Sequence, residues 1–239
     1  MDVRKVERHK VDPMKLAQLL EEGPEVCHLD LSDECLAEID ATGHFFVEVD
    51  FRGADWCKPD GKGGIVAANL SQATFRECLI GNHESESWWA GVSGRELQVF
   101  FETLPSDQVA PSLEVPGTLF YLRADGARLP KSLWYRAHFG GSPEDWGPSF
   151  DGTDLSEATF MECNLRDVDW ATANLHGASI LKPVSVFGLR IRSEDAKSVA
   201  ENIELAPAAA DVVYKFALER FGYLYALNHL GIVVVELEE

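Results

Sequence analysis

Residues 148–182 read PSFDG TDLSE ATFME CNLRD VDWAT ANLHG ASILK, which is seven consecutive groups of five residues. The third residue of every group is large and apolar: Phe150, Leu155, Phe160, Leu165, Trp170, Leu175 and Ile180. A period of five fits neither the helical repeat nor the two-residue alternation of a strand. A chain that turns a corner every five residues points one such side chain inward from each side. The pattern therefore predicts a coil around a stack of apolar side chains.

The same period occurs earlier in the chain. Six groups over residues 29–58 have Leu31, Leu36, Ala41, Phe46, Phe51 and Trp56 in third place. After a slip of four residues, four more groups have Ile65, Leu70, Phe75 and Ile80 there. The residue two before the centre is usually small, and the residue directly before it is usually Asp or Asn. We interpret residues 61–64, where the phase slips, as a corner loop.

Seven of these groups carry a family resemblance: ADWCK, ANLSQ, ATFRE, TDLSE, ATFME, CNLRD and ANLHG. Their pattern, A-(D/N)-(L/F)-x-x, resembles the pentapeptide-repeat family, over residues 27–82 in a first block and 148–183 in a second. The resemblance implies a mainly β fold, a right-handed quadrilateral β-helix. Four five-residue sides would make one coil, and stacked coils would pair backbone to backbone at about 4.8 Å.

Two further segments precede and interrupt the blocks. Residues 1–26 predict an N-terminal helical cap, because Asp12 can cap a helix and Pro13 fits its first turn. Residues 83–147 lack the repeat, and their apolar runs predict an inserted β-rich segment with a turn at Asp125-Gly126. The alternative is that part of this insertion is further coil with altered spacing.

Residues 184–239 predict an α/β C-terminal segment that either caps the coils or forms a dimer. We expect a strand over 187–191, a helix that Ser193 caps and that runs to Ile203, and a terminal strand over 230–237. Between them, a second helix would begin after Pro207 and end at Gly222. The family resemblance implies a homodimer through this segment.

The sequence nominates no catalytic residue, cofactor site or metal ligand. The seven histidines show no H-x-x-x-H or HExxH spacing, and no P-loop, G-x-G-x-x-G or G-x-S-x-G motif occurs. The five cysteines contain no C-x-x-C pair, which favours buried thiols in a reducing cytoplasm. No apolar run is long enough for a membrane span, and no signal sequence precedes the repeats. We therefore expect a cytoplasmic protein.

The charge balance points to the kind of partner. Forty acidic residues against 21 basic ones give a net charge of −19. This charge argues against binding nucleic acid directly, because phosphate contacts need clustered Lys and Arg. It favours a basic protein, or a protein that normally grips DNA. The alternative is a solvated acidic surface without a partner.

The family resemblance makes this hypothesis specific, because its members in fluoroquinolone resistance are understood to imitate DNA in gyrase. It implies a topoisomerase-interacting protein that protects or inhibits DNA gyrase or topoisomerase IV. The carboxylates expected to leave the coils and meet such a partner are Asp50, Asp55, Asp154, Glu157, Glu162, Asp167 and Asp169. Trp88 and Trp89 are a further candidate partner surface, or else a buried lid over the first block.

Three classes of function follow. The leading hypothesis is the non-catalytic DNA mimic, and the second is a scaffold or immunity-type protein that binds an unrelated basic partner. The third is an enzyme with its site in residues 83–147, which a deep pocket lined by His138 or His229 would favour.

Overall fold

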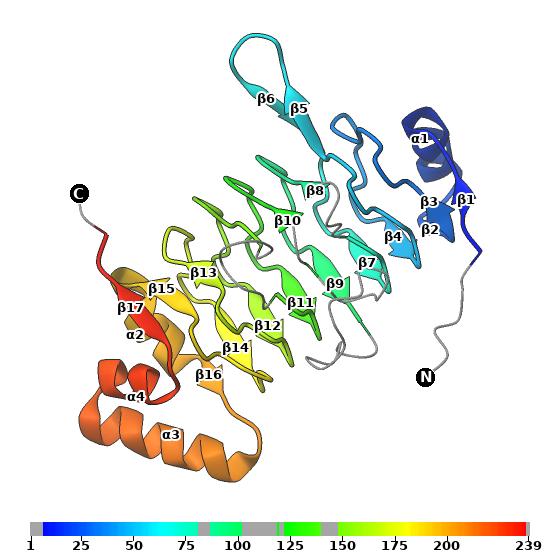
Figure 1. Cartoon of the computed structure of the whole chain (residues 1–239). Coiled ribbons are helices and arrows are strands. Elements are labelled where there is room, and N and C mark those ends of the chain that lie inside the picture. Colours follow the sequence, from blue (N-terminus) through cyan, green and yellow to red (C-terminus); the bar gives the residue numbers. More distant parts are fainter. Residues whose placement is uncertain (1–6, 81–86, 102–118, 120–121, 140–147, 238–239) are drawn as a thin grey trace.

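The computed structural model describes residues 7–80, 87–101, 119, 122–139 and 148–237. Short parallel strands stack along a rod, with α1 at its N-terminal end and the other helices at its C-terminal end (Figure 1). The main sheet contains β2 (Glu25–Cys27), β4 (Phe45–Val47), β7 (Thr74–Arg76), β9 (Gln98–Phe100), β11 (Leu133–Tyr135), β12 (Thr159–Met161), β14 (Ser179–Leu181) and β16 (Ile203–Glu204), paired in this order.

Three more rows of backbone pairing run along the rod, so each coil has four sides. One row begins with β1 (His9–Lys10) on β3 (Leu29–Asp30). Another contains β8 (Ser87–Trp88) on β10 (Leu122–Arg123), and β13 (Asp169–Trp170), β15 (Arg190–Arg192) and β17 (Val233–Val235). The last consists of bridges from Asp40 to Asn69, Ser93, Arg128, Asp154 and Asn174. Where nothing is inserted, paired residues lie twenty positions apart, as Phe160 and Ile180 do.

The core is the predicted stack of central residues. All seven central residues of the second block are buried, and so are those of residues 29–58 together with Leu70, Phe75 and Ile80. Aromatic rings contact one another inside the core, for example Phe160 and Trp170 at 4.5 Å between centroids. The pentapeptide-repeat β-helix expected from the spacing is therefore confirmed, with largely parallel strands and C-terminal helices.

The expectation of a separate β-rich insertion over residues 83–147 is wrong for its described part. β9 pairs with β7 on one side and with β11 on the other, so these residues continue the same sheet. Trp89, Ala124, Leu129, Trp134 and Phe139 are buried central residues spaced in multiples of five. The alternative, further coil with altered spacing, describes this stretch. Asp125-Gly126 does form a turn, but at a coil corner.

Ile65 is the one central residue that the spacing places wrongly. It lies in an antiparallel hairpin of β5 (Cys57–Pro59) and β6 (Ile65–Ala67), which projects from the rod in Figure 1. Ile65 is exposed there, and Gly63 is at the hairpin tip rather than in the core. The Asp60 carboxylate orders the tip by accepting hydrogen bonds from the Lys62 and Gly64 amides. The phase slip is therefore a hairpin, not a simple corner loop.

Both ends of the rod carry helices. α1 (Pro13–Glu22) begins as predicted, with the Asp12 carboxylate accepting a hydrogen bond from the Lys15 amide at 2.7 Å. α2 (Ser193–Glu201) follows β15, but Ser193 is its first residue and makes no capping hydrogen bond, so that detail is wrong. α3 (Ala208–Phe221) lies between Pro207 and Gly222 as expected, and α4 (Tyr223–His229) is an additional helix. No helix in the described residues is long and apolar enough to cross a membrane.

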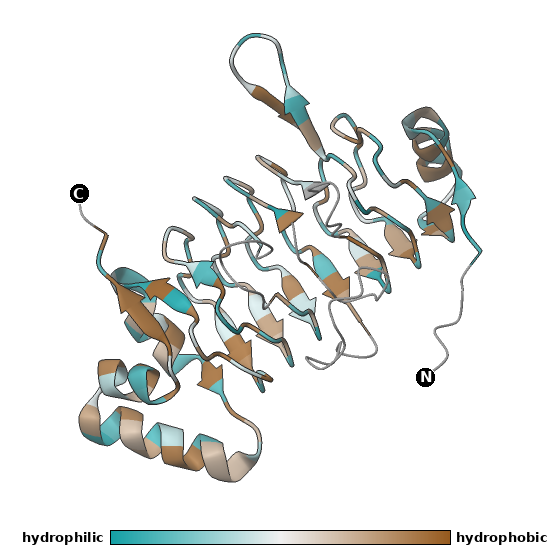
Figure 2. Ribbon diagram, viewed as in Figure 1, coloured by the Kyte–Doolittle hydropathy of each residue, from teal (hydrophilic) through white to brown (hydrophobic). Residues whose placement is uncertain are grey.

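Figure 2 shows β17 entirely in the colour of hydrophobic residues and shows many hydrophilic residues at the loops and corners. The first strand of residues 184–239 differs from the prediction, because β15 covers Arg190–Arg192 rather than 187–191. The terminal strand is shorter than the expected 230–237.

Candidate protein-binding surfaces

At eight corners, the Asp or Asn directly before the centre has a structural task. Its side-chain oxygen accepts a hydrogen bond from the backbone N–H two residues later, at 2.9–3.1 Å. This contact occurs at Asp30, Asp40, Asp50, Asn69, Asp154, Asn164, Asp169 and Asn174. Asp and Asn serve equally because both offer the oxygen that such a turn needs. Three of the predicted partner-binding carboxylates, Asp50, Asp154 and Asp169, therefore order corners of their own coils.

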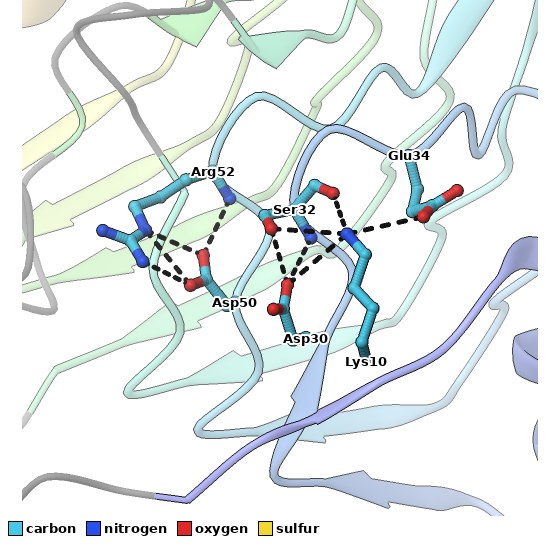
Figure 3. A network of polar contacts seen from close by, with 6 residues as sticks. All are labelled: Lys10, Asp30, Ser32, Glu34, Asp50 and Arg52. Carbon is cyan, nitrogen blue, oxygen red and sulfur yellow. Dashed lines mark hydrogen bonds and ion pairs between the residues drawn. The ribbon is translucent and has the colours of Figure 1, made fainter.

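Asp50 is also held by a neighbouring cation. Its side chain is only 5% exposed and Oδ2 lies 2.6 Å from Nη2 of Arg52 (Figure 3). In the preceding coil, Lys10 contacts Asp30 at 3.7 Å and Glu34 at 3.4 Å. Burial opposes ionisation of Asp30, but hydrogen bonds from Ser32 and the charge of Lys10 outweigh it and lower the pKa of that carboxyl. Asp50 is therefore part of an internal network.

Four predicted carboxylates of the second block also have basic partners. Their ion pairs are Glu157 with Lys131 at 3.4 Å, Glu162 with Arg136 at 2.8 Å, Asp167 with Arg166 at 3.3 Å and Asp169 with Arg190 at 2.6 Å. Three of these pairs join neighbouring coils. Their charges are partly neutralised within the rod, so they do not form a continuous acidic stripe.

Position rather than charge explains why so many of these groups lie at corners. The residue two after most centres has a positive φ, as in Glu157 (56°), Glu162 (54°) and Asp167 (58°). Elsewhere the same position holds glycine, for example Gly152 and Gly177. The left-handed backbone turns the chain into the next side and directs these side chains away from the core.

Asp55 differs from the five ion-paired carboxylates because burial and a neighbouring acid, rather than a base, set its environment. Burial raises the pKa of this carboxyl, and the charge of Asp33 adds to the effect despite a hydrogen bond from the Trp88 amide. Its Oδ1 atom is buried and accepts no hydrogen bond from the described residues. An environment that disfavours the ionised form makes Asp55 a weaker ligand for an external cation than its sequence position indicates.

The two adjacent tryptophans have different surroundings. Trp89 is fully buried, with its ring 6.1 Å from Trp56 and 5.8 Å from Phe75, so its assignment to a partner surface is wrong. Trp88 is 42% exposed, and its carbonyl accepts a hydrogen bond from the Trp56 amide at 2.8 Å. Because side chains alternate along a strand, one tryptophan faces the core and the other faces solvent.

Acidic residues are concentrated at the N-terminal end of the rod. Residues 20–60 contain twelve acidic and two basic residues. The 144 residues from 61 to 204 contain twenty acidic and twelve basic residues. The 41 residues from 20 to 60 therefore carry a net charge of −10, whereas the 144 residues that follow carry −8, so negative charge is densest on the first two coils.

This acidic end is hollowed by a groove of about 360 Å³ between α1 and the first coil. Leu20 and Ile39 contribute its buried apolar part, while Glu21 on α1 and Glu38 and Asp40 on the coil line it with carboxylates. None of these residues was among the predicted site residues. In the sequence, the high density of acidic residues over residues 20–60 is the feature that could have indicated this groove.

The C-terminal helices present an apolar surface. Its exposed members are Val212, Val213, Phe216, Phe221, Leu224 and Tyr225. The rings form a continuous series, with 6.4 Å between Phe216 and Phe221 and 4.9 Å between Phe221 and Tyr225. Exposed apolar side chains that touch one another indicate an interaction surface more strongly than scattered ones.

A second cavity, of about 500 Å³, bears on the enzyme hypothesis. It lies beside β13 and β17, and neither His138 nor His229 lines it. Within the described ranges, no three His, Cys, Asp or Glu residues are arranged to hold a metal ion. Burial raises the pKa of both Cys78 and Cys163 to about 12, so these thiols stay protonated in the core.

Comparison with known proteins agrees with the coil geometry. A family model described as pentapeptide repeats (8 copies) matches residues 153–181. The repeats and the stacked coils together make this chain a pentapeptide-repeat protein. No curated protein sequence matches it.

Solved structures of two pentapeptide-repeat proteins are similar to the chain at low identity. A trypsin-treated variant of QnrB1, a plasmid-mediated fluoroquinolone resistance protein, is 12% identical over 98% of this chain and 95% of its own, with a TM-score of 0.30. Full-length QnrB1 is 16% identical over 90% and 95%, with a TM-score of 0.27. HetL of the cyanobacterium Nostoc sp. strain PCC 7120 is 16% identical over 64% and 73%, with a TM-score of 0.19.

Proposed function

We propose that this protein is a non-catalytic acidic binding protein whose partner is a DNA-handling enzyme, a type II topoisomerase such as DNA gyrase or topoisomerase IV. It would occupy the basic surface that otherwise holds duplex DNA, and so inhibit the enzyme or change its drug sensitivity. The proposal places the protein in the cytoplasm with its partner.

The observation that carries the proposal is the excess of acid on a regular rod. The net charge is −19, and residues 20–60 alone contribute twelve acidic against two basic residues. Coils stacked at the strand-pairing distance of about 4.8 Å hold these groups in fixed rows. A basic saddle built for phosphates would attract such rows at long range and would release them as salt is added.

The ion pairs shift the expected contact surface toward the N-terminal end. Glu157, Glu162, Asp167 and Asp169 already have basic neighbours, and exposed pairs contribute only about 0–1 kcal/mol each. Carboxylates of the first two coils have few bases within their own stretch of sequence. We therefore place the main partner contact on coils one and two.

A gyrase supercoiling assay, with and without a fluoroquinolone, tests the proposal. Wild-type protein at micromolar concentration should inhibit supercoiling or alter the drug's effect. A variant with Glu22→Gln, Glu25→Gln, Asp33→Asn and Glu48→Gln should lose this activity. A charge-matched control with Asp154→Asn, Glu157→Gln, Glu162→Gln and Asp169→Asn should keep most of it. Wild-type protein without any effect on gyrase or topoisomerase IV would show that the topoisomerase proposal is wrong.

A second function is favoured by one observation, the exposed ring of Trp88 near the base of the β5–β6 hairpin. The Trp88 carbonyl is 3.7 Å from Sγ of Cys57, the first residue of β5. An exposed aromatic next to a projecting element suits a scaffold or immunity-type protein that binds an unrelated basic partner. Capture of a partner from the native host by wild-type protein but not by Trp88→Ala, together with no effect on gyrase, would support this function.

The apolar surface of α3 and α4 suits a homodimer through the C-terminal segment. Six side chains that are each more than half exposed offer on the order of 600 Å² of apolar surface. A standard interface buries about 800 Å² per partner, so a second copy could cover this surface. Sedimentation equilibrium should show a dimer for wild-type protein and a monomer for Phe216→Glu, with unchanged circular dichroism. A wild-type monomer at 50 μM, roughly the upper range of such measurements, would contradict the dimer.

A further inference from the structure

The groove at the N-terminal end has a distinct combination of shape and charge. Its volume is about 360 Å³, and it separates α1 from residues 38–44 of the first coil. Ile39 and Leu20 are buried, whereas Glu21 and Asp40 are exposed at its edges. Carboxylates therefore face it from both walls, above an apolar base.

The two walls are held in place by identified contacts. His44 connects them, because its Nε2 atom is 3.0 Å from the Leu20 carbonyl of α1 and its Nδ1 atom is 3.0 Å from the Thr42 carbonyl. The Asp40 carboxylate accepts hydrogen bonds from the Thr42 amide and hydroxyl at 3.1 and 2.6 Å. On the coil side, Lys58 of the hairpin contacts Glu38 at 2.6 Å. The groove is thus formed before any partner arrives.

The chemistry of the groove fits a basic side chain with a long apolar stem. The methylene groups of Lys or Arg can lie on an apolar surface while the charged head remains at a polar edge. Here the head would lie between Glu21 on one wall and Asp40 on the other. Among the described residues Lys58 pairs with Glu38 only, so the local charge in the groove stays negative. The cation would also relieve the mutual repulsion of these carboxylates.

We propose that this groove receives a basic, amphipathic peptide segment of the protein partner, with a Lys or Arg stem on Leu20 and Ile39 and its head between Glu21 and Asp40. This inference rests on the proposed function in that it names the part of the acidic end that recognises the partner. It adds a specific site, because the rest of the acidic surface would act mainly through long-range attraction.

Fluorescence anisotropy with labelled peptides tests the site. The probe is a nonapeptide with Lys-Leu-Lys at its centre. One comparison peptide replaces both lysines by 2,4-diaminobutyrate, which keeps the charge but shortens the apolar stem, and another has Glu-Leu-Glu there. Wild-type protein should bind Lys-Leu-Lys at least fivefold more tightly than the short-stem peptide and should not bind Glu-Leu-Glu. Equal binding of the two cationic peptides would overturn the proposal, because charge alone would then explain the affinity.

Variants locate the binding on the protein. Glu21→Gln with Asp40→Asn should weaken Lys-Leu-Lys binding about tenfold or more, and asparagine keeps the oxygen that orders the Thr42 turn. Glu194→Gln with Glu201→Gln, exposed on α2 at the opposite end, removes the same charge and should change binding less than twofold. Ala17→Lys, an exposed helix position at the groove, should compete with the peptide. Equal weakening by both double variants would also overturn the site.

The supercoiling assay separates this inference from the proposed function. Loss of peptide binding in the Glu21 and Asp40 variant with unchanged action on gyrase would leave the topoisomerase proposal standing and assign the groove to another protein. Peptide binding in the absence of any gyrase effect would leave the groove standing and reject that partner. Absence of peptide binding by correctly folded wild-type protein would reject the groove.

Discussion

At the scale of single residues, each group of five divides its tasks by position. The central residue fills the core, an Asp or Asn before it orders the turn at eight corners, and the residue two after it adopts a left-handed backbone in most groups. Leu165 is fully buried between neighbouring coils, and its amide donates to the Ser185 carbonyl at 2.9 Å. These roles explain the repeat more fully than composition does, because an Asp is needed for its oxygen as much as for its charge.

We predict that Leu165→Ala lowers the free energy of unfolding by about 2–5 kcal/mol, because it removes buried methyl groups and leaves a cavity in a close-packed stack. Denaturant unfolding followed by circular dichroism measures the change. The neighbouring Arg166→Ala, at an exposed position, should cost less than about 0.5 kcal/mol. A loss at Leu165 as small as that of the control would contradict its place in the core.

Asp154 offers a test of the position before the centre. Its Oδ1 atom accepts from the Ser156 amide at 3.0 Å and from the Asn174 side chain at 2.9 Å. Asp154→Asn keeps an oxygen for the turn, so we expect a change within about 0.5 kcal/mol. Asp154→Ala removes both contacts and should cost about 1–2 kcal/mol in the same unfolding experiment. Equal losses in the two variants would show that charge, rather than the turn, is what matters there.

At the scale of elements, the rod depends on ends that stop the stacking. In the second block the Leu155 and Glu157 amides donate to backbone carbonyls of the next coil. One coil later, the Leu175 amide donates to the Asp195 carboxylate at 2.9 Å and the Gly177 amide to the Ser198 hydroxyl at 3.1 Å. α2 therefore supplies side-chain oxygens where another strand would supply carbonyls, and this side of the rod cannot extend.

Asp195→Ala should accordingly lower the free energy of unfolding by about 2–4 kcal/mol, since it leaves the buried Leu175 amide without its acceptor and separates Arg192 from its partner at 2.6 Å. Thermal unfolding and concentration-dependent light scattering measure stability and end-to-end association. Glu194→Ala, exposed on the same helix turn, is the control and should behave like wild type. Wild-type stability in the Asp195 variant would contradict the capping role.

Elements that depend only on local five-residue spacing could be predicted from the sequence, and the others could not. The central residues from Phe150 to Ile180 keep an uninterrupted period of five and were predicted correctly. The coils between Trp89 and Phe139 were missed because small residues hold central positions there. Gly94 is one of them. A Cβ at this position would lie 2.7 Å from the Leu129 side chain, so there is no room for a larger central residue. Ala124 is another, and the interruptions before Trp89 and after Phe139 break the phase.

The candidate site was less predictable than the fold, because pairing between coils joins residues that are distant in sequence. Arg136 and Glu162 are 26 residues apart and yet lie 2.8 Å from each other. Counting charges along a block cannot detect such neutralisation. The surface near Trp88 was anticipated in part, since adjacent tryptophans on a strand must face opposite sides. The groove beside α1 required knowledge of how the cap helix meets the first coil.

At the scale of the whole molecule, the rod is electrically asymmetric. Residues 20–60, in its first coils, carry a net charge of −10 out of −19 for the whole chain. Its far end carries an apolar helical surface. A dimer through α3 and α4 would bury the apolar ends and keep the two acidic ends apart, which limits repulsion between copies with a charge of −19 each.

The same asymmetry predicts how the molecule behaves toward nucleic acid. Binding to duplex DNA requires enough clustered Lys and Arg to displace counterions from phosphates. The basic residues that are paired in the later coils, such as Lys131, Arg136 and Arg190, contact carboxylates of adjacent turns and are not free to do so. We therefore predict that labelled duplex DNA shows no mobility shift with 10 μM protein, roughly a typical non-specific dissociation constant, at physiological salt. A shift that weakens steeply with added salt would contradict this prediction and would exclude mimicry of DNA as the basis of the function.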